Sequence, residues 1–259
     1  MIIRLFILGL VLLLSACTAV LPTTPVVPQE LAGVVKSDLS LSGEILLTGD
    51  LLILPGVTVT LLPGTTLHIR ASESTKIDPE YLSSYTEILV RGALNATGTA
   101  AAPIRFLPET PAVDGEIAWA GIIFDRTTGS TLRHCQIEGA EQGVLVMAST
   151  VQVSDNLLRG CRYGMVVQGV GATSIHDNQI AAGEGGLFLL AGAQADVSGN
   201  RITGQSEEGL FVDRRSSPIL GRNEISNNDI GLLLHNPDLP FERSGISANR
   251  EDIRIIGGE

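Results

Sequence analysis

Few residues in this chain could do chemistry, and the most suggestive are two aspartates at equivalent positions of successive sequence repeats, Asp155 and Asp177. If the repeats stack as neighbouring strands, the two backbones lie about 4.8 Å apart, and carboxylates at that spacing can share a hard cation. The other repeats place His134, Gly199 and Arg222 at this position, so no third carboxylate joins them. We therefore keep the pair as a weak metal candidate and predict that both are solvated turn residues.

The histidines and internal cysteines do not combine into a metal or redox centre. His134 and His176 fall at different positions of their repeats, and the chain has no His-x-His motif. Cys135 and Cys161 are offset by five residues within the repeat, which separates them by roughly 15 Å along the coil, too far for a disulfide. We predict no bound metal or other cofactor, so that a copper or zinc role would require another chain.

Cys17 is the cysteine for which the sequence predicts covalent chemistry. Arg4 precedes an apolar run that is too short to cross a bilayer and that ends in Leu14-Ser-Ala-Cys17. This ending resembles a bacterial lipobox, in which the cysteine is acylated. We predict a lipoprotein signal peptide at residues 1–16 and a lipid-anchored Pro/Thr-rich tether at residues 17–39. Thr18 favours the outer membrane, facing the periplasm, or the cell surface.

The overall charge excludes one class of partner. The chain has 28 acidic and 17 basic side chains and a formal net charge of −11, so its surface repels nucleic acid on average. Aromatic residues make up only 4% of the chain and there are 29 glycines, a composition that suits many tight turns. We predict no nucleic-acid partner.

Two sequence columns with the same period identify the elements that position these residues. In one column an asparagine lies between two aliphatic residues, and its members are 22, 22 and 23 residues apart: Asn156, Asn178, Asn200 and Asn223. The other column is a glycine followed by three apolar residues, at Gly121, Gly143, Gly164, Gly186, Gly209 and Gly231. Short strands at this period predict an all-β parallel β-helix over residues 40–259, with coils of about 22 residues. The stacked asparagines are predicted to form a ladder that ends at a buried Cys135.

A resemblance to known proteins supports this fold. The runs Ile88–Thr99, Pro103–Phe106 and Trp119–Phe124 resemble bacterial right-handed parallel β-helix proteins of the pectin-lyase-like superfamily, and the later copies resemble its generic repeat. The resemblance implies a right-handed helix but no single function, because the superfamily includes lyases, hydrolases, adhesins and proteins of no known activity. The Asn-Thr-Asp, Asp-Asp and Gly-His-Gly motifs of its polygalacturonase-like members are absent from the chain. We therefore name no catalytic residue.

The strongest positive feature is an apolar stripe on the outside of the predicted solenoid. Side chains alternate along a strand, so when the first and third residues after each glycine fill the core, the second points outward. These outward residues are apolar in six successive repeats: Ile123, Leu145, Val166, Phe188, Phe211 and Leu233. The stripe is about 25 Å long. It marks either a docking surface or a face that other parts of the chain cover, such as residues 71–86 or the tether.

Together these features predict a noncatalytic lipoprotein of the cell envelope whose rigid β-helix presents a lateral binding surface to a protein partner or a glycan. Two alternatives remain open. One is a carbohydrate-active enzyme, a polysaccharide lyase or hydrolase of an unrecognised type, which would need converging carboxylates in a groove. The other is an accessory subunit of an envelope assembly, similar to the β-helix proteins that assist periplasmic metalloenzyme maturation.

Overall fold

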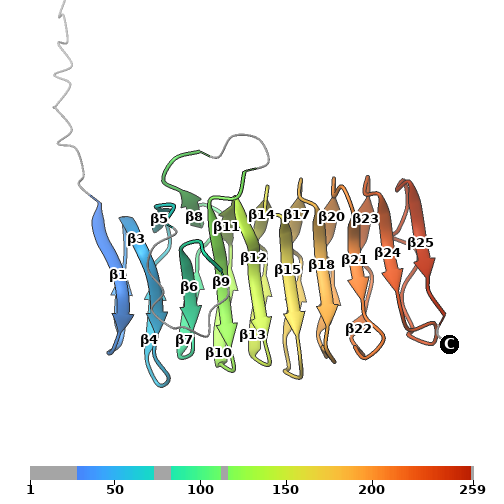
Figure 1. The fold of residues 1–259 in the computed structure, drawn as a ribbon, viewed down its shortest axis with the longest axis horizontal. Helices are drawn as coiled ribbons and strands as arrows, with labels where there is room; N and C mark the ends of the chain where they lie inside the picture. Colours follow the sequence, from blue (N-terminus) through green and yellow to red (C-terminus); the bar gives the residue numbers. More distant parts are fainter. Residues whose placement is uncertain (1–27, 73–82, 112–115, 258–259) are drawn as a thin grey trace, which may run out of the picture.

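The computed structural model describes residues 28–72, 83–111 and 116–257, and these form one elongated solenoid whose coils follow one another in chain order (Figure 1). Each coil pairs in parallel with the next. The described residues contain no helix, so none of these elements has the length and apolar character of a membrane-spanning helix. The architecture is the right-handed parallel β-helix that the sequence predicts.

Three rows of strands form the sides of the solenoid. One row is a separate eight-stranded sheet: β2 (Leu39–Leu41), β4 (Thr58–Leu61), β7 (Ala93–Thr97), β10 (Thr128–Arg133), β13 (Thr150–Ser154), β16 (Ser174–His176), β19 (Asp196–Ser198) and β22 (Ile219–Leu220). The second row follows the bend that contains the asparagine column. Its strands are β5 (Thr66–Ile69), β8 (Ile104–Pro108), β11 (Cys135–Glu138), β14 (Leu157–Arg159), β17 (Gln179–Ala181), β20 (Arg201–Thr203) and β23 (Glu224–Ser226).

The third row, which we call the glycine row, carries the glycine column and bears the site described below. It contains β6 (Glu87–Val90), β9 (Trp119–Asp125), β12 (Ala140–Met147), β15 (Tyr163–Gln168), β18 (Gly185–Leu190), β21 (Glu208–Val212), β24 (Ile230–Leu234) and β25 (Glu251–Ile255). Two long strands, β1 (Gln29–Val35) and β3 (Glu44–Ile53), bend through the second and third rows and join them into one 17-stranded sheet.

The core register agrees with the prediction. The aliphatic residues on either side of each ladder asparagine are buried, as with Ile175 and Ile180 around Asn178. The first and third residues after each glycine are buried as well, as with Leu187 and Leu189 after Gly186. Burying these side chains on every coil supplies the main driving force for stacking.

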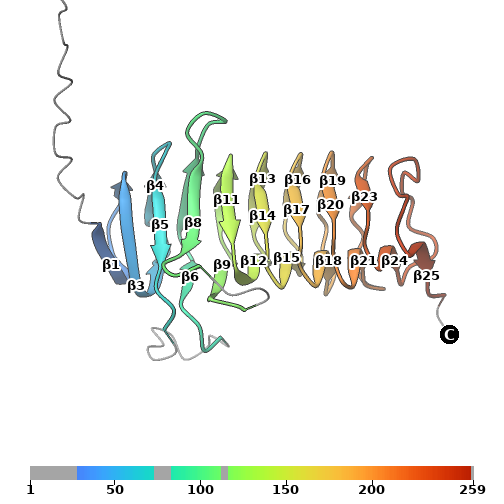
Figure 2. The same ribbon diagram turned by 90° about the horizontal axis from the view of Figure 1, so that it is seen from above.

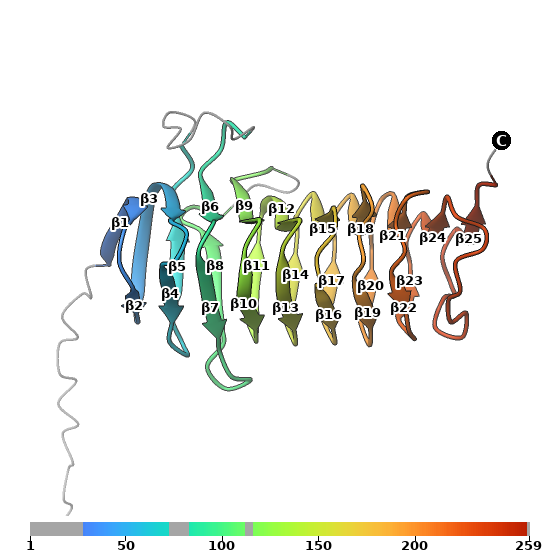
Figure 3. The same ribbon diagram turned by 90° about the horizontal axis from the view of Figure 1, so that it is seen from below.

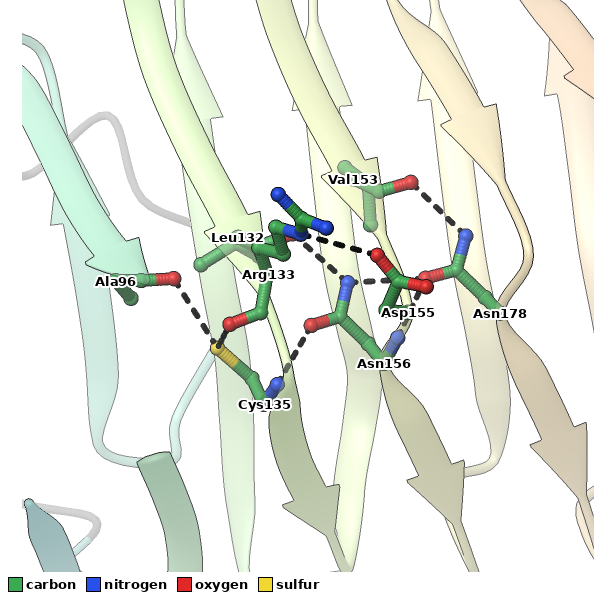
Figure 4. A network of polar contacts seen from close by, with 8 residues as sticks. All are labelled: Ala96, Leu132, Arg133, Cys135, Val153, Asp155, Asn156 and Asn178. Atoms are coloured by element: carbon green, nitrogen blue, oxygen red, sulfur yellow. Dashed lines mark hydrogen bonds and ion pairs between the residues drawn. The ribbon is translucent and has the colours of Figure 1, made fainter. Parts of the chain in front are cut away.

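The predicted asparagine ladder is present and runs through the interior of the bend (Figure 4). The Asn156 amide donates to Asn178 Oδ1 at 2.9 Å, and the same 2.9 Å bond joins Asn178 to Asn200 and Asn200 to Asn223. Each amide also donates to a main-chain carbonyl, for example Asn178 to Val153 at 2.9 Å. The amides of this ladder therefore have partners, which is the condition for burying them at low cost.

Cys135 ends this ladder, as predicted. Its backbone N–H donates to Asn156 Oδ1 at 2.8 Å, and its thiol lies 3.4 Å from the Ala96 carbonyl, in the role that the amide group plays on later coils (Figure 4). Cys161 and Cys135 are both free and buried. Burial raises the pKa of each thiol to about 12, so both remain protonated at neutral pH.

A second ladder, which the sequence analysis missed, occupies the next bend. Gln205 donates its backbone N–H to Asn228 Oδ1 at 2.9 Å, and the Asn228 amide donates to Asn249 Oδ1 at 2.9 Å. Cys161 ends this ladder: its thiol lies 3.8 Å from the Ile137 carbonyl, and Gln205, Asn228 and Asn249 donate to the equivalent carbonyls of later coils. The two internal cysteines are thus ladder residues at two different bends.

The solenoid begins earlier than predicted. Strand β1 lies within the segment 17–39 that the sequence marked as a tether, and its residues Gln29–Leu31 and Gly33–Val35 pair with β3. The predicted domain boundary at residue 40 is therefore about eleven residues too late. The alternation of β1 is weak because its side chains are mostly exposed or half-buried, as expected for the first strand of a stack. Cys17 and the signal peptide lie outside the described residues.

Two connections interrupt the first coils. The described residues that follow β5 and β8 and those that precede β6 and β9 leave the solenoid on the side that carries β6, β9 and β12 (Figures 2 and 3). After β9 the coils follow one another without such excursions. The N-terminal and C-terminal parts of the solenoid therefore share a cross-section but differ in regularity.

Candidate functional site

The predicted apolar stripe exists as one continuous column on the glycine row. Each member is the direct strand partner of the next, from Ile123 through Leu145, Val166, Phe188 and Phe211 to Leu233. The column extends further toward the N-terminus through Leu89, Leu52 and Val34, and it ends at Arg254 on the last strand. Nine successive coils therefore carry an apolar residue at the same outward position.

Val34, the first member of the column, is 40% exposed, but the three members that follow it are buried. Leu52, Leu89 and Ile123 are 6%, 2% and 6% exposed and form a small hydrophobic cluster of their own, against which Leu54 and Met147 pack. We call these three residues the aliphatic segment. They lie on the coils where the two connections leave the solenoid (Figure 3). In this part of the molecule the outward column behaves as a second core.

The later part of the column is aromatic and only half-buried. Phe188 and Phe211 stack with ring centroids 5.3 Å apart and planes 15° apart. Tyr163 meets Phe188 edge-on at 5.2 Å, and the His235 ring lies 5.2 Å from Phe211. We call these four residues the aromatic segment. All four are half-buried, whereas Val166 and Leu233, which belong to the same column, are 5% and 6% exposed.

Glycine makes room for this aromatic stack. A Cβ atom at Gly185, just before Phe188, would lie 2.2 Å from the phenyl ring and 2.9 Å from Tyr163. No side chain fits there, so the glycine allows the ring to lie flat against the main chain of its own strand. The aromatic segment is therefore a built feature in which the backbone and four rings fit together.

A line of charged residues borders the aromatic segment on one side. It follows the start of the glycine strands on successive coils, because the Glu184 N–H donates to the Arg162 carbonyl and the Glu207 N–H to the Glu184 carbonyl. Arg162 lies between two carboxylates, 3.6 Å from Glu141 and 3.4 Å from Glu184. Within the described part of the chain no cation lies at ion-pair distance from Glu207 or Glu208.

The carboxylates of this border affect the pKa of Tyr163. Partial burial of the ring raises the pKa of Tyr163, and the negative charges of Glu207 and Glu184 raise it further. On the other side of the stripe Asp213 is a structural residue, since it accepts hydrogen bonds from the backbone N–H groups of Ala191, Arg215 and Ser216. Burial raises the pKa of Asp213, but these bonds outweigh burial and hold its pKa below the usual range.

The weak metal pair from the sequence occupies tight turns. Asp155 and Asp177 have φ of 58° and 57°, in the left-handed region that aspartate tolerates better than most residues. Asp155 accepts a hydrogen bond from Arg133 at 3.1 Å (Figure 4). No group of three or more His, Cys, Asp or Glu side chains that could hold a metal occurs among the described residues.

The soft metal donors of the described chain are dispersed. His68 contacts Glu44 at 2.6 Å, His176 contacts Ser198 at 2.7 Å, and His235 belongs to the aromatic segment. His134 lies in a tight turn with a φ of 49°, Met147 packs against the aliphatic segment, and Met165 is a core residue. The two described cysteines are protonated ladder residues at different bends. Copper favours deprotonated thiolate, thioether and imidazole ligands that converge on one point, and these residues do not supply such a set.

One pair of carboxylates was missed by the sequence analysis. The Glu87 backbone N–H donates to Asp50 Oδ1 at 3.1 Å, and both side chains are buried. They lie 37 residues apart in the chain, so no local motif connects them. Asp125, the last residue of the neighbouring strand β9, is buried between two arginines, with Arg91 and Arg126 both at 2.9 Å. Burial raises the pKa of Asp125, but hydrogen bonds from Arg126 and Arg91 hold it below the usual range.

Comparison with known proteins adds one finding. A family model described as "Periplasmic copper-binding protein (NosD)" matches residues 113–249, which is more than half of the chain. No curated protein and no solved structure matches the chain. The matched residues include most of the stripe and both ladders. The copper in the description does not fit the donors of the described residues, since they neither converge nor carry thiolates.

Proposed function

Because the chain belongs to the NosD family of periplasmic copper-binding proteins, we propose that it is a noncatalytic accessory protein of the cell envelope that acts by docking a protein partner along its glycine row. The β-helix serves as a rigid rod that presents the stripe at fixed spacing. Metal handling belongs to the partner in this proposal. No step of the function runs through a copper ion held by the described residues.

The observation that carries this proposal is the outward apolar column. The outward positions of a solvated sheet are expected to include polar residues, yet nine coils in succession carry apolar ones. In the second half of the column the residues are large aromatics, which are enriched at protein interfaces. The stripe thus offers a surface that a partner can bind.

A protein partner fits the stripe better than a glycan does. Sugar rings bind aromatic side chains by stacking on an open ring face. Here Phe188 and Phe211 cover each other, Tyr163 closes one end of the stack and His235 packs at the other. The exposed parts are ring edges, which pack well against aliphatic and aromatic side chains.

The proposal includes attachment of the rod to a membrane through an acylated Cys17, which is supported by the lipobox-like sequence that ends at this residue. Replacing Cys17 by serine is expected to release the exported protein from the membrane fraction into the soluble envelope fraction. A Cys17→Ser protein that still sediments with membranes would contradict the anchor and leave the docking surface unaffected.

Photo-crosslinking in intact cells tests the docking function. A photoreactive amino acid at Phe211 is expected to give one discrete adduct with another envelope protein. The matched control carries the photoreactive amino acid in place of Glu224 instead. Glu224 is exposed on the neighbouring row, and its strand partner is Arg201. Absence of an adduct at Leu145, Phe188 and Phe211, or equal adducts at Glu224, would contradict the proposal.

Copper binding provides a second test of the same proposal. Purified Cys17→Ser protein, equilibrated with Cu(I) or Cu(II) and then desalted, is expected to retain well under one copper ion per chain. Stoichiometric retention that is lost on replacing a described histidine or cysteine would contradict the proposal that metal handling belongs to the partner.

A second candidate, a carbohydrate-active enzyme, is favoured by one observation, the neighbouring buried carboxylates Asp50 and Glu87. Paired carboxylates are the usual acid and base of glycoside chemistry. Incubation with acidic and neutral polysaccharides separates the two candidates. Cleavage that disappears in a Glu87→Gln variant would replace the docking function by the enzyme.

A further inference from the structure

The border of the aromatic segment has an unbalanced charge. Three of its carboxylates, Glu184, Glu207 and Asp229, lie on successive coils, and Glu141 lies two coils before Glu184. Arg250 pairs with Asp229 at 2.8 Å. Arg162 is shared between Glu141 and Glu184. Glu207 and the adjacent Glu208 therefore have no cation of the described chain beside them. Carboxylates next to one another in this way repel unless a cation is supplied from outside.

The position of this excess charge coincides with the aromatic rings. Glu208 is the first residue of β21, the strand that carries Phe211, and its neighbour Glu207 is close enough to raise the pKa of Tyr163. Phe211 and Glu208 lie on β21 itself, and Glu207 directly precedes this strand. In the aliphatic segment the outward side chains are closed instead.

Resting on the docking function proposed above, we propose that the aromatic segment and the carboxylates of Glu184, Glu207 and Glu208 together receive a partner segment in which apolar side chains are flanked by lysine or arginine. The apolar side chains of that segment pack on the edges of Phe188 and Phe211. Its cations lie beside Glu207 and Glu208 and complete a charge pattern that this chain leaves open.

Charge also decides against a second copy of this chain as the occupant. The net charge of −11 makes two copies repel, and facing stripes would bring two acidic borders into one interface. A basic partner gains from the same field, which speeds its association and makes binding sensitive to salt.

A peptide titration tests this inference with the purified full-length protein. The probe is a short fluorescent peptide in which lysine alternates with leucine and phenylalanine, and the control probe has glutamate in place of each lysine. Saturable binding of the lysine peptide alone is expected. A Glu207→Gln/Glu208→Gln variant is expected to bind about threefold to tenfold more weakly and with less dependence on salt. Phe188→Ser/Phe211→Ser is expected to weaken binding about tenfold or more.

Two controls make these results specific. The Asp177→Asn/Glu224→Gln variant removes the same number of charges from exposed positions away from the stripe, and it is expected to bind like the unchanged protein. Equal weakening in this control would show general attraction to an acidic protein and overturn the inference. The circular dichroism spectrum of each variant reports whether the β-helix is folded, and the charge variant carries the test if the phenylalanine variant does not fold.

Other outcomes would assign the surface differently. A reversible dimer, detected by sedimentation and abolished by the Glu207→Gln/Glu208→Gln or Phe211→Ser change, would make a second copy the occupant. Crosslinking of a partner at Phe211 without binding of the lysine peptide would overturn the inferred partner chemistry while leaving the docking function intact. Binding of the lysine peptide without any crosslinked partner would contradict the docking function while supporting the binding chemistry of the surface.

Discussion

The coils that carry the aliphatic segment and the coils that carry the aromatic segment have the same cross-section but are stabilised differently. Around Leu52, Leu89 and Ile123 the chain makes its two long connections, and the members of the column are 37 and 34 residues apart. Around Phe188 and Phe211 the coils repeat regularly, and both bends contain a hydrogen-bonded ladder. The outward column is part of the core in the first region and a half-open surface in the second.

The difference between the two segments indicates how one face of a solenoid can remain available for binding. In the later coils the interior aliphatic side chains and the two ladders stabilise the stack from inside, so the outward aromatic rings contribute less to stability. In the early coils, which lack the ladders, the outward column is closed and supplies a second small core. Stability and binding are thus assigned to different parts of one continuous column.

The largest expected effect is the loss of stability at Leu89. Leu89→Ala removes a buried side chain from the aliphatic segment and should lower the free energy of unfolding by about 2 to 4 kcal/mol. Phe188→Ala in the aromatic segment should cost about 1 to 2 kcal/mol, because the ring is only half-buried. Urea unfolding of the two variants measures both values. A larger loss at Phe188 than at Leu89 would contradict the assignment of stability to the early column.

A ladder substitution tests the internal support of the later coils. Asn178→Ala removes donors to Val153 and Asn200 and leaves the Asn156 amide without its acceptor, which should cost about 1 to 3 kcal/mol. Urea unfolding again provides the measurement. Gln194→Ala, at an exposed position just before β19, is the control and should change stability by less than about 0.5 kcal/mol. Equal values for the two variants would show that the ladder does not support these coils.

Alkaline pH tests the two thiols at the ends of the ladders. In the unfolded chain a thiol ionises near its ordinary pKa of 9.0, whereas in the folded chain burial keeps Cys135 and Cys161 protonated up to a pKa of about 12. Their contribution is therefore fully present below pH 9 and is lost as the pH rises from 9 to about 12. Each thiol should lower stability by about 1.4 kcal/mol per pH unit in this range.

Cysteine-to-serine variants check the origin of this slope. Cys135→Ser and Cys161→Ser should each make the fall in urea stability above pH 9 shallower than in the unchanged protein, since serine does not ionise there. An identical slope in all three proteins would show that other groups cause the alkaline loss. Below pH 9 the thiols should resist modification until the β-helix unfolds.

The repeating half of the molecule could be predicted from the sequence because its register is local. A fixed interval between asparagines and between glycines places Ile180, Leu187 and Phe188 on their faces without any further information. The first ladder and its end at Cys135 follow from the same columns. These features depend on strand alternation and on one bend conformation, which nearby residues determine.

The parts that escaped prediction depend on distant segments of the chain. Long connections separate Leu52 and Leu89 from the regular column. In the second ladder a glutamine and a glycine stand in place of asparagine, at Gln205 and Gly183, so the sequence shows no asparagine repeat there. Strand β1 has no sequence repeat to mark it, so it was placed in the tether. Asp50 and Glu87 meet only because two coils stack with a connection between them.

The most direct test of the account measures whether the aromatic segment is open in the isolated chain and covered in the cell. A Phe211→Cys variant, with Cys17 replaced by serine, can be labelled with a maleimide both as purified protein and in intact envelopes. The native thiols of Cys135 and Cys161 do not react, because they are buried and protonated. Gln152→Cys, on the exposed face of β13, controls for access of the reagent. We expect labelling at position 211 to be about tenfold slower in envelopes than in solution, with no such change at position 152. Equal labelling rates at position 211 in both settings would contradict docking on this surface.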